Sequence, residues 1–199
     1  MPREAAANLL PITGVEVNSD HPLASNFRAL ILATPNGGAY DAISGVTATK
    51  HGTNPPAARG YGASVLSEMS SANANYLQFA STDRYNVAGA GVDLTIVWRG
   101  WIGSIYNFCN LVSKASGSGI SNNPYDVYVD SSGHLNIVRA ASTDYVVHQF
   151  ASSVPATGWY DIVISASSDL TVSPKAYVNG KSFTATRVFG SISGPANGN

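Results

Sequence analysis

The sequence predicts an all-β protein, a sandwich of two antiparallel sheets. The first observation is a hairpin pattern over residues 123–138, where apolar side chains alternate on both sides of an Asp-Ser-Ser-Gly turn, at Tyr125, Val127, Val129, Leu135 and Ile137. Because alternation buries only one face of a hairpin, a second sheet has to cover these side chains. The second observation is that further short strand patterns follow in close order, separated by Gly-, Ser- and Pro-containing turns.

The strand signals can be placed in chain order. A Pro-led turn at His21-Pro22 feeds an apolar run that ends at Ala33, and a Gly-, Ser- and Pro-rich stretch from Ala39 to about Asn75 indicates short strands or loop. The expected strands after it cover residues 76–79, 92–99, 108–114, 125–138 (the hairpin), 144–150, 159–166 and 175–183.

Three of these segments indicate side-chain directions or a turn. Period-two spacing directs Leu94, Ile96 and Trp98 to one side of the 92–99 strand, and it directs Tyr160, Ile162 and Ile164 inward. Asn179-Gly180 is the preferred pair for a two-residue type I′ turn, so residues 175–183 are expected to form a second hairpin.

We expect three parts along the chain. Residues 1–20 contain Pro11 and Gly14 and lack an apolar face long enough for a stable helix, so they are interpreted as an N-terminal arm. Residues 21–187 form a single β domain, and residues 188–199 are a Gly- and Ser-rich tail.

Composition limits the possible partners. The chain has 199 residues, of which 44% are hydrophobic and only 12% charged, with a formal net charge of −1. Its basic residues are dispersed, which argues against nucleic acid as a partner, and no apolar run approaches the length that spans a bilayer. We therefore expect neither nucleic-acid nor membrane binding. The single cysteine, Cys109, excludes an internal disulfide and sits in an apolar run typical of a buried strand.

The order of the strand motifs resembles a known family. The motifs are similar, in their order and spacing, to laminin-G-like domains of the concanavalin-A-like lectin/glucanase superfamily. They are Tyr-Leu-Gln-Phe at 76–79, Leu-Thr-Ile-Val-Trp at 94–98, Leu-Val-Ser-Lys at 111–114, the 125–133 hairpin segment, Gly-Trp-Tyr-Asp-Ile-Val-Ile at 158–164 and Tyr-Val-Asn-Gly at 177–180. The resemblance implies a jelly-roll sandwich. The segment His21-Pro22-Leu23-Ala24 further resembles the opening of laminin-G-like structural proteins of tailed bacteriophages.

The resemblance leads to an expectation about assembly. Family members close with a strand pair that pairs with the first strand, whereas this sequence has Gly-Ser-Ile-Ser-Gly-Pro-Ala-Asn-Gly-Asn at 190–199. An edge near Leu30 would then be open, to be filled by the N-terminal arm or by a neighbouring subunit.

Catalysis is not expected from the carboxylates. A glycoside hydrolase needs two of them across the scissile bond, and the only glutamates, Glu4, Glu16 and Glu68, are not paired on any expected strand. Asp126 and Asp130 share a strand face, but Asp130 begins a turn and is interpreted as a turn-forming residue. No catalytic residue is therefore assigned, and the chain is predicted not to be an enzyme.

No cofactor or metal ligand is assigned either. Calcium is kept as an alternative because oxygen ligands from loop aspartates such as Asp83, Asp144 and Asp169 suit it, although these residues do not form a compact ligand ladder.

Sugar binding would require an exposed aromatic ring beside Asn or Asp side chains. Trp101, Tyr106 and Tyr145 fit that description best and are the candidate ligand-binding residues, with a sheet rim or subunit contact as the alternative role for them.

Taken with the resemblance, the sequence favours a non-enzymatic structural protein of a phage virion, produced in the host cytoplasm. It would be a capsid decoration or a tail or adsorption component, in contact with other virion proteins or further copies of itself. The alternative is a carbohydrate-binding adhesion module that recognises glycans on the host surface.

Overall fold

The chain is all-β and divides into two compact units, Met1–Tyr85 and Asn86–Asn199. The computed structural model describes residues 28–33, 38–51, 57–58, 63–64, 68–70, 73–81, 85, 93–102, 109–114, 125–141 and 144–191. Within these ranges every regular element is a β-strand. We find no helix in the described segments with the length and apolar character needed to cross a membrane. The expected arm at 1–20 lies outside the described residues.

The described residues of the first unit form seven short strands in three small sheets. These strands are β1 (Ile31–Ala33), β2 (Ala39–Asp41), β3 (Thr49–His51), β4 (Ala57–Ala58), β5 (Ala63–Ser64), β6 (Glu68–Ser70) and β7 (Asn73–Gln78). The sheets are the antiparallel pairs β1–β2 and β4–β5 and the three-stranded sheet β3–β7–β6. Short strands after Ala39 were expected from the Gly-, Ser- and Pro-rich composition, and the structure confirms them.

One buried carboxylate organises the start of this unit. Asp41 is fully buried, and its Oδ1 accepts hydrogen bonds from the backbone N–H groups of Leu30 (2.9 Å) and Ile43 (3.0 Å). Its Oδ2 accepts from the hydroxyls of Ser44 (2.5 Å) and Tyr85 (2.8 Å). Burial alone would raise the pKa of Asp41, but these four hydrogen bonds together lower it.

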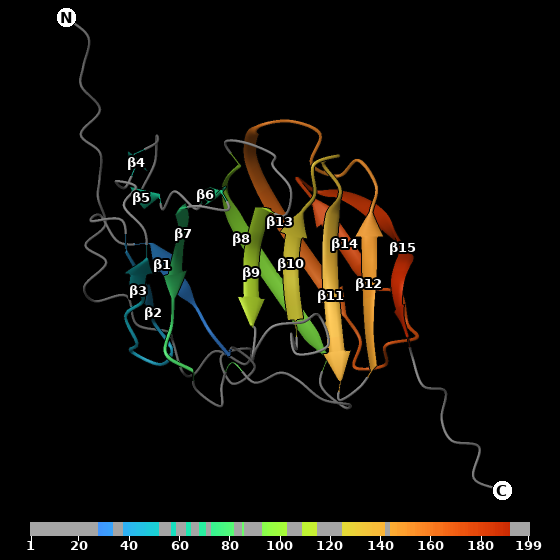
Figure 1. Cartoon of the computed structure of the whole chain (residues 1–199), viewed down its shortest axis with the longest axis horizontal. Helices are drawn as coiled ribbons and strands as arrows, with labels where there is room; N and C mark the ends of the chain where they lie inside the picture. The colour runs from blue at the N-terminus through green and yellow to red at the C-terminus, as the bar shows by residue number, and fades with distance from the viewer. Residues whose placement is uncertain are drawn as a thin grey trace, which may run out of the picture. The chain divides into compact units, whose positions relative to one another are not determined.

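In the second unit the described strands form one eight-stranded antiparallel sheet in the order β8-β13-β14-β15-β12-β11-β10-β9. Its strands are β8 (Leu94–Ile102), β9 (Cys109–Lys114), β10 (Tyr125–Val129), β11 (Leu135–Ala141), β12 (Asp144–Phe150), β13 (Gly158–Ala166), β14 (Lys175–Val178) and β15 (Lys181–Ser191). In Figure 1, β9 to β12 lie in front of β8, β13 and β14, so the sheet curves back on itself until it is nearly barrel-shaped.

The long strand β15 connects the two halves of this sheet. Its first part pairs with β14, from Lys181↔Val178 to Thr184↔Lys175, and its second part pairs with β12, from Ala185↔Phe150 onward. A bulge opposite Val147 and His148 shifts the register within the second part. Bulges increase local twist, which fits the turn of the sheet at this strand.

Side chains from both halves fill the space between them. The core cluster is apolar and consists of Ile102, Val127, Val129, Leu135, Ile137, Phe150, Val154, Tyr160, Ile162, Ile164, Ala166, Ala176 and Val178. Ile96 and Trp98 pack against it from β8. The inward directions expected for β8, β13 and the 125–138 hairpin are therefore confirmed for these side chains.

Both predicted hairpins are present with the expected turn residues. Gly133 has φ 73°, and Asn179 and Gly180 have φ 50° and 78°, the two positive values that a type I′ turn requires. At Gly133 an added Cβ would also collide with the carbonyl oxygen of Val154, which explains the glycine there.

Two expectations about this unit were wrong. The hairpin was expected to bury one face only, yet Asp126, Asn136 and Val138, which point away from the core cluster, are buried as well. The tail was expected from Val188, but β15 continues to Ser191. Gly190 explains the extension, because an added Cβ there would collide with the backbone of Tyr145 and Val146, so only glycine lets β15 approach β12 this closely.

Candidate binding face

Among the described residues of the second unit, the outward side of β8, β13 and β14 carries the most exposed cluster of large apolar side chains. We call this surface the outer face and define it by Val97, Arg99, Trp101, Trp159, Asp161, Val163 and Tyr177. These residues alternate with the inward residues of the same strands, so they point away from the core.

The local sequence of β8 keeps this alternation regular. Trp98 turns its indole ring back over Gly100, where an added Cβ would lie only 2.5 Å from the ring. Gly100 therefore lets the large Trp98 ring lie along the inner side of the strand. The neighbouring positions, Arg99 and Trp101, remain on the outer side.

Strand register arranges the outer face in three rows. Trp101 is paired with Trp159, Arg99 with Asp161, and Val97 with Val163, which in turn is paired with Tyr177. Directly opposite side chains on neighbouring antiparallel strands are in contact distance, so each row is a contact unit. A charged row thus lies between an indole row and an aliphatic row that ends in a tyrosine.

The indole row is an edge-to-face aromatic pair. The ring centroids of Trp101 and Trp159 lie 6.1 Å apart with an interplanar angle of 72°. This geometry places the positive ring edge against the negative ring face. Trp159 nevertheless keeps 47% of its surface exposed, so a broad part of its indole is available for contact.

The charged row is an exposed ion pair fixed at one side by the neighbouring turn. Arg99 Nε lies 3.2 Å from Asp161 Oδ1, and the two side chains are 79% and 60% exposed. Such an exposed pair contributes at most about 1 kcal/mol to stability. The Asn179 side chain accepts a 2.8 Å hydrogen bond from the Asp161 backbone N–H, and the Asn179 N–H donates a 2.8 Å bond to the Asp161 carbonyl.

Two side chains of the aliphatic row are unusually exposed to solvent. Val97 is 74% exposed and Tyr177 46%, with the half-buried Val163 between them. Single exposed apolar side chains are common, but a group of them on a sheet that also carries two tryptophans marks an interaction surface.

The residues expected to bind a ligand do not come together. Trp101 lies on the outer face, whereas Tyr145 lies on β12 in the opposite half of the sheet, where its ring packs against Phe189 with centroids 5.6 Å apart. Tyr106 lies outside the described residues. Trp101 and Tyr145 therefore belong to different surfaces.

Sequence reasoning missed Val97, Trp159 and Tyr177. A signal for them was present, because Val97 and Trp159 alternate with the inward residues predicted for their strands, and Tyr177 precedes the Asn-Gly turn by two positions. What the sequence did not provide was the register that places β8 beside β13 and so brings these side chains together.

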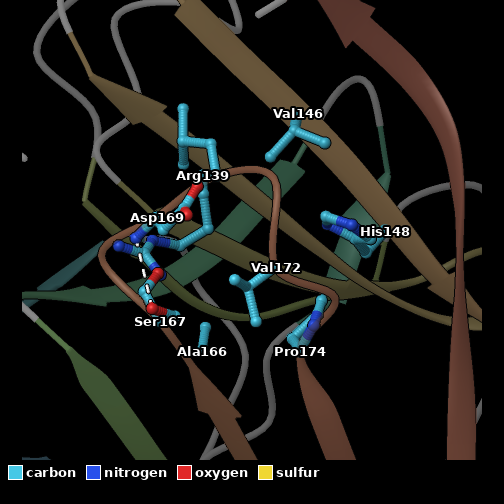
Figure 2. Close-up of a pocket in the computed structure, with 9 residues that line it drawn as sticks. Arg139, Val146, His148, Ala166, Ser167, Asp169, Val172 and Pro174 are labelled. Atoms are coloured by element: carbon cyan, nitrogen blue, oxygen red, sulfur yellow. Dashed lines mark hydrogen bonds between the residues drawn. The ribbon is translucent and has the colours of Figure 1, made fainter.

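A small cavity lies at one end of the core, beneath the loop from Ser167 to Pro174 (Figure 2). Its volume of about 10 Å³ accommodates one water molecule, so it is too small for an organic substrate. The buried Arg139 lines it and donates a 2.6 Å hydrogen bond from Nη1 to the Ser167 carbonyl. Burial lowers the pKa of Arg139, and the charge of Asp93 opposes that effect.

His148 lines the same cavity and is also buried; in Figure 2, Val172 lies between it and Arg139. Its Nδ1 has no hydrogen-bond partner among the described residues. Burial lowers the pKa of His148, and the positive charges of Arg187 and Arg139 lower it further. The imidazole is therefore held in its neutral form.

Asp126 in β10 and Asp130, directly after the strand, have different environments. Burial raises the pKa of Asp126 to about 6, against the opposing effect of a hydrogen bond from Ser113. Asp130 instead accepts hydrogen bonds from the backbone N–H groups of Ser132 and His134, both to Oδ1. Burial would raise the pKa of Asp130, but these bonds, one from Asn136 and the charge of His134 lower it. Asp130 thus forms the turn, as the sequence indicated.

Of the loop aspartates considered for calcium, Asp144 and Asp169 lie on different elements of the second unit. Asp169 accepts hydrogen bonds from the backbone N–H (2.8 Å) and the hydroxyl (2.7 Å) of Thr171, and Asp144 begins β12. Asp83 lies outside the described residues. In the part of the chain that the structure describes, there is no group of three His, Cys, Asp or Glu side chains placed to hold a metal ion.

Comparisons with protein-family models, curated proteins and solved structures find no match for this chain.

Proposed function

We propose that this chain is a non-enzymatic structural protein of a bacteriophage particle, a capsid decoration or a tail or adsorption component, that acts through protein–protein contacts. The observation that carries the proposal is the exposure of Val97, Trp159 and Tyr177 on one sheet face. Tryptophan, tyrosine and arginine are the residues that contribute most to binding energy at protein interfaces, and this face holds all three types. The sparsely charged composition fits the same role.

The phage assignment and the finer fold assignment depend on the resemblance described above. We propose that the two facing halves of the sheet correspond to the two sheets of a laminin-G-like jelly roll. The order of strand motifs supports this correspondence, as does the shared apolar core between the halves. In that arrangement the outer face is the surface of one sheet, available to a neighbouring virion protein.

Incorporation into particles tests the proposal. We expect the chain in particles purified from the virus that encodes it, detected by quantitative mass spectrometry in a fixed ratio to the capsid or tail proteins. Val97→Asp and Trp159→Ser, which place a charge or a small polar group on the outer face, should reduce incorporation by about tenfold or more.

The matched control is Val188→Asp, because Val188 is an exposed valine outside the outer face. It should leave incorporation unchanged. If the chain is absent from purified particles, or if both outer-face variants incorporate as well as wild type, the proposal is wrong.

A second candidate function is glycan recognition by an adhesion module. The observation that favours it is the exposed indole of Trp159, whose row neighbours the charged pair Arg99 and Asp161, so stacking and hydrogen bonding to one sugar ring are both available. A glycan array should then show saturable binding that free sugar competes and that Trp159→Ala removes. Absence of binding to any glycan on the array would reject this candidate.

A further inference from the structure

We infer that the outer face binds a second copy of this chain in a two-fold symmetric dimer. The inference rests on the proposed function and identifies the partner that the outer face contacts. It depends on the order of side chains within each row, which makes the face complementary to itself.

The complementarity follows from the register of β8 and β13. A two-fold axis in the plane of the contact, parallel to these strands and midway between them, exchanges the two positions of every row. Arg99 of one copy then meets Asp161 of the other, and Asp161 meets Arg99. The four charges then alternate in sign.

The uncharged rows fit the same axis. Trp101 of one copy comes to lie over Trp159 of the other, and Val97 over Val163. Indole meets indole and valine meets valine, as expected for an isologous contact, in which one patch serves both partners. Tyr177 on β14 then extends past the β8 strand of the other copy and lies at the rim.

The size of the face predicts a weak dimer. If β8 and β13, of nine residues each, make contact along their whole length, the contact is roughly 30 Å long at about 3.4 Å per residue, and the strand pair with its side chains is about 10–15 Å wide. The resulting footprint of roughly 300–450 Å² per copy is smaller than the roughly 800 Å² of a standard interface. We therefore expect a dissociation constant in the range of about 10 μM to 1 mM.

Burial in the dimer would change the role of the ion pair. Within one chain Arg99 and Asp161 are exposed, and water screens their attraction. Between two copies the same groups are desolvated and interact with both partners, so like charges placed there would oppose association strongly. Specificity for the second copy thus depends on one arginine and one aspartate.

Charge reversal with mixing tests this arrangement in the full-length chain. Arg99→Asp leaves two acids in the charged row, and Asp161→Arg leaves two bases. The dissociation constant of each variant alone should therefore rise by at least about tenfold. An equimolar mixture should associate again, because the acidic face of one variant complements the basic face of the other. Analytical ultracentrifugation up to about 1 mM chain measures all three samples.

The controls are Asp169→Arg and Lys181→Asp, which reverse exposed charges that lie outside the outer face. Both should dimerise like wild type. Thermal unfolding of every variant establishes that loss of association does not reflect loss of folding.

Two results would overturn the inference. One is a wild-type chain that stays monomeric at about 1 mM, and the other is a mixture that associates no better than the single variants. If either occurs while Trp159→Ser still prevents incorporation into particles, the proposed function stands and the partner is a different protein. If the wild-type chain is monomeric and Trp159→Ala abolishes glycan binding, glycan recognition replaces both the dimer and the structural role in the phage particle.

Discussion

The hydroxyl of Tyr85 donates a 2.8 Å hydrogen bond to Oδ2 of Asp41, which lies 44 positions earlier in the chain. Asp41 is fully buried and holds the backbone of Leu30 and Ile43 as well as the side chain of Ser44. Tyr85 therefore connects the end of the first unit to the turn after β2. A charged group at this depth is stable only because four donors surround it.

The first prediction is that Tyr85→Phe weakens the first unit locally. Loss of one hydrogen bond to a charged acceptor should cost about 1.5–3 kcal/mol. Native-state hydrogen exchange at the amides of Leu30 and Ile43 measures the loss, since both donate to the same carboxylate. Tyr76→Phe is the control, because Tyr76 is exposed. Unchanged exchange at both amides would contradict the role given to Tyr85.

A second prediction separates steric fit from backbone conformation at the two hairpin turns. Gly133 and Gly180 have nearly equal φ values of 73° and 78°, but an added Cβ meets the Val154 carbonyl only at Gly133. Gly180→Ala should therefore cost about 1 kcal/mol, the strain of a left-handed alanine. Gly133→Ala should cost at least about 2 kcal/mol more. Urea unfolding of both variants gives the difference, and equal losses would show that Val154 moves aside.

The third prediction concerns the buried carboxyl of Asp126. Its pKa is about 6 in the folded chain and 3.8 for the free group, so the folded state binds the proton more tightly. The contribution of the Asp126 carboxyl to the stability of the folded chain is complete below pH 3.8 and is lost as the pH rises through about 6. The shift corresponds to about 3 kcal/mol.

Asp126→Asn removes this titration. Relative to wild type, the variant should become more stable by about 1–3 kcal/mol at pH 8 and show no gain at pH 4. Urea unfolding at several pH values measures the difference. A variant with the wild-type pH dependence would assign the titration to another group.

The fourth prediction has the opposite sign because it concerns a buried base. The pKa of His148 is lowered from 6.5, so the unfolded chain takes up a proton first as the pH falls. The contribution of His148 to the stability of the folded chain is complete above pH 6.5 and decreases as the pH falls below that value. NMR titration of the imidazole should show a pKa below 6.5, and Arg187→Gln should move it upward.

Arg99→Gln is the matched control for this titration, since Arg99 lies on the outer face of the opposite half. It should leave the His148 titration unchanged. An equal response to both substitutions would mean that net charge, and not the proximity of Arg187, sets the pKa.

Local patterns predicted the features that depend on local physics. The positive φ values at Gly133, Asn179 and Gly180 follow from residue type and turn length, and the inward residues of β8 and β13 follow from alternation. The register that pairs β8 with β13 joins segments about sixty positions apart and leaves no local trace. For that reason Trp101 was expected as a binding residue, while its partner Trp159 was missed.

The burial of Asp126 and the end of β15 could not be predicted for a related reason. Alternation placed Asp126 on the polar side of its strand, and only tertiary structure buries that side. Residues 188–191 contain glycine and serine, which favour a tail, yet Gly190 is required where β15 approaches the backbone of Tyr145. Glycine there serves close packing of two strands, a role that composition cannot distinguish from flexibility.

The position of β15 has a consequence for biosynthesis. Since β14 and β12 both need this strand as a neighbour, neither half of the sheet has its full set of partners until residue 191 has left the ribosome. Until then the growing chain carries apolar strands with open edges, which favour aggregation. Folding of the second unit should therefore be late and abrupt, and ribosome-bound chains that stop before β15 should depend on chaperones.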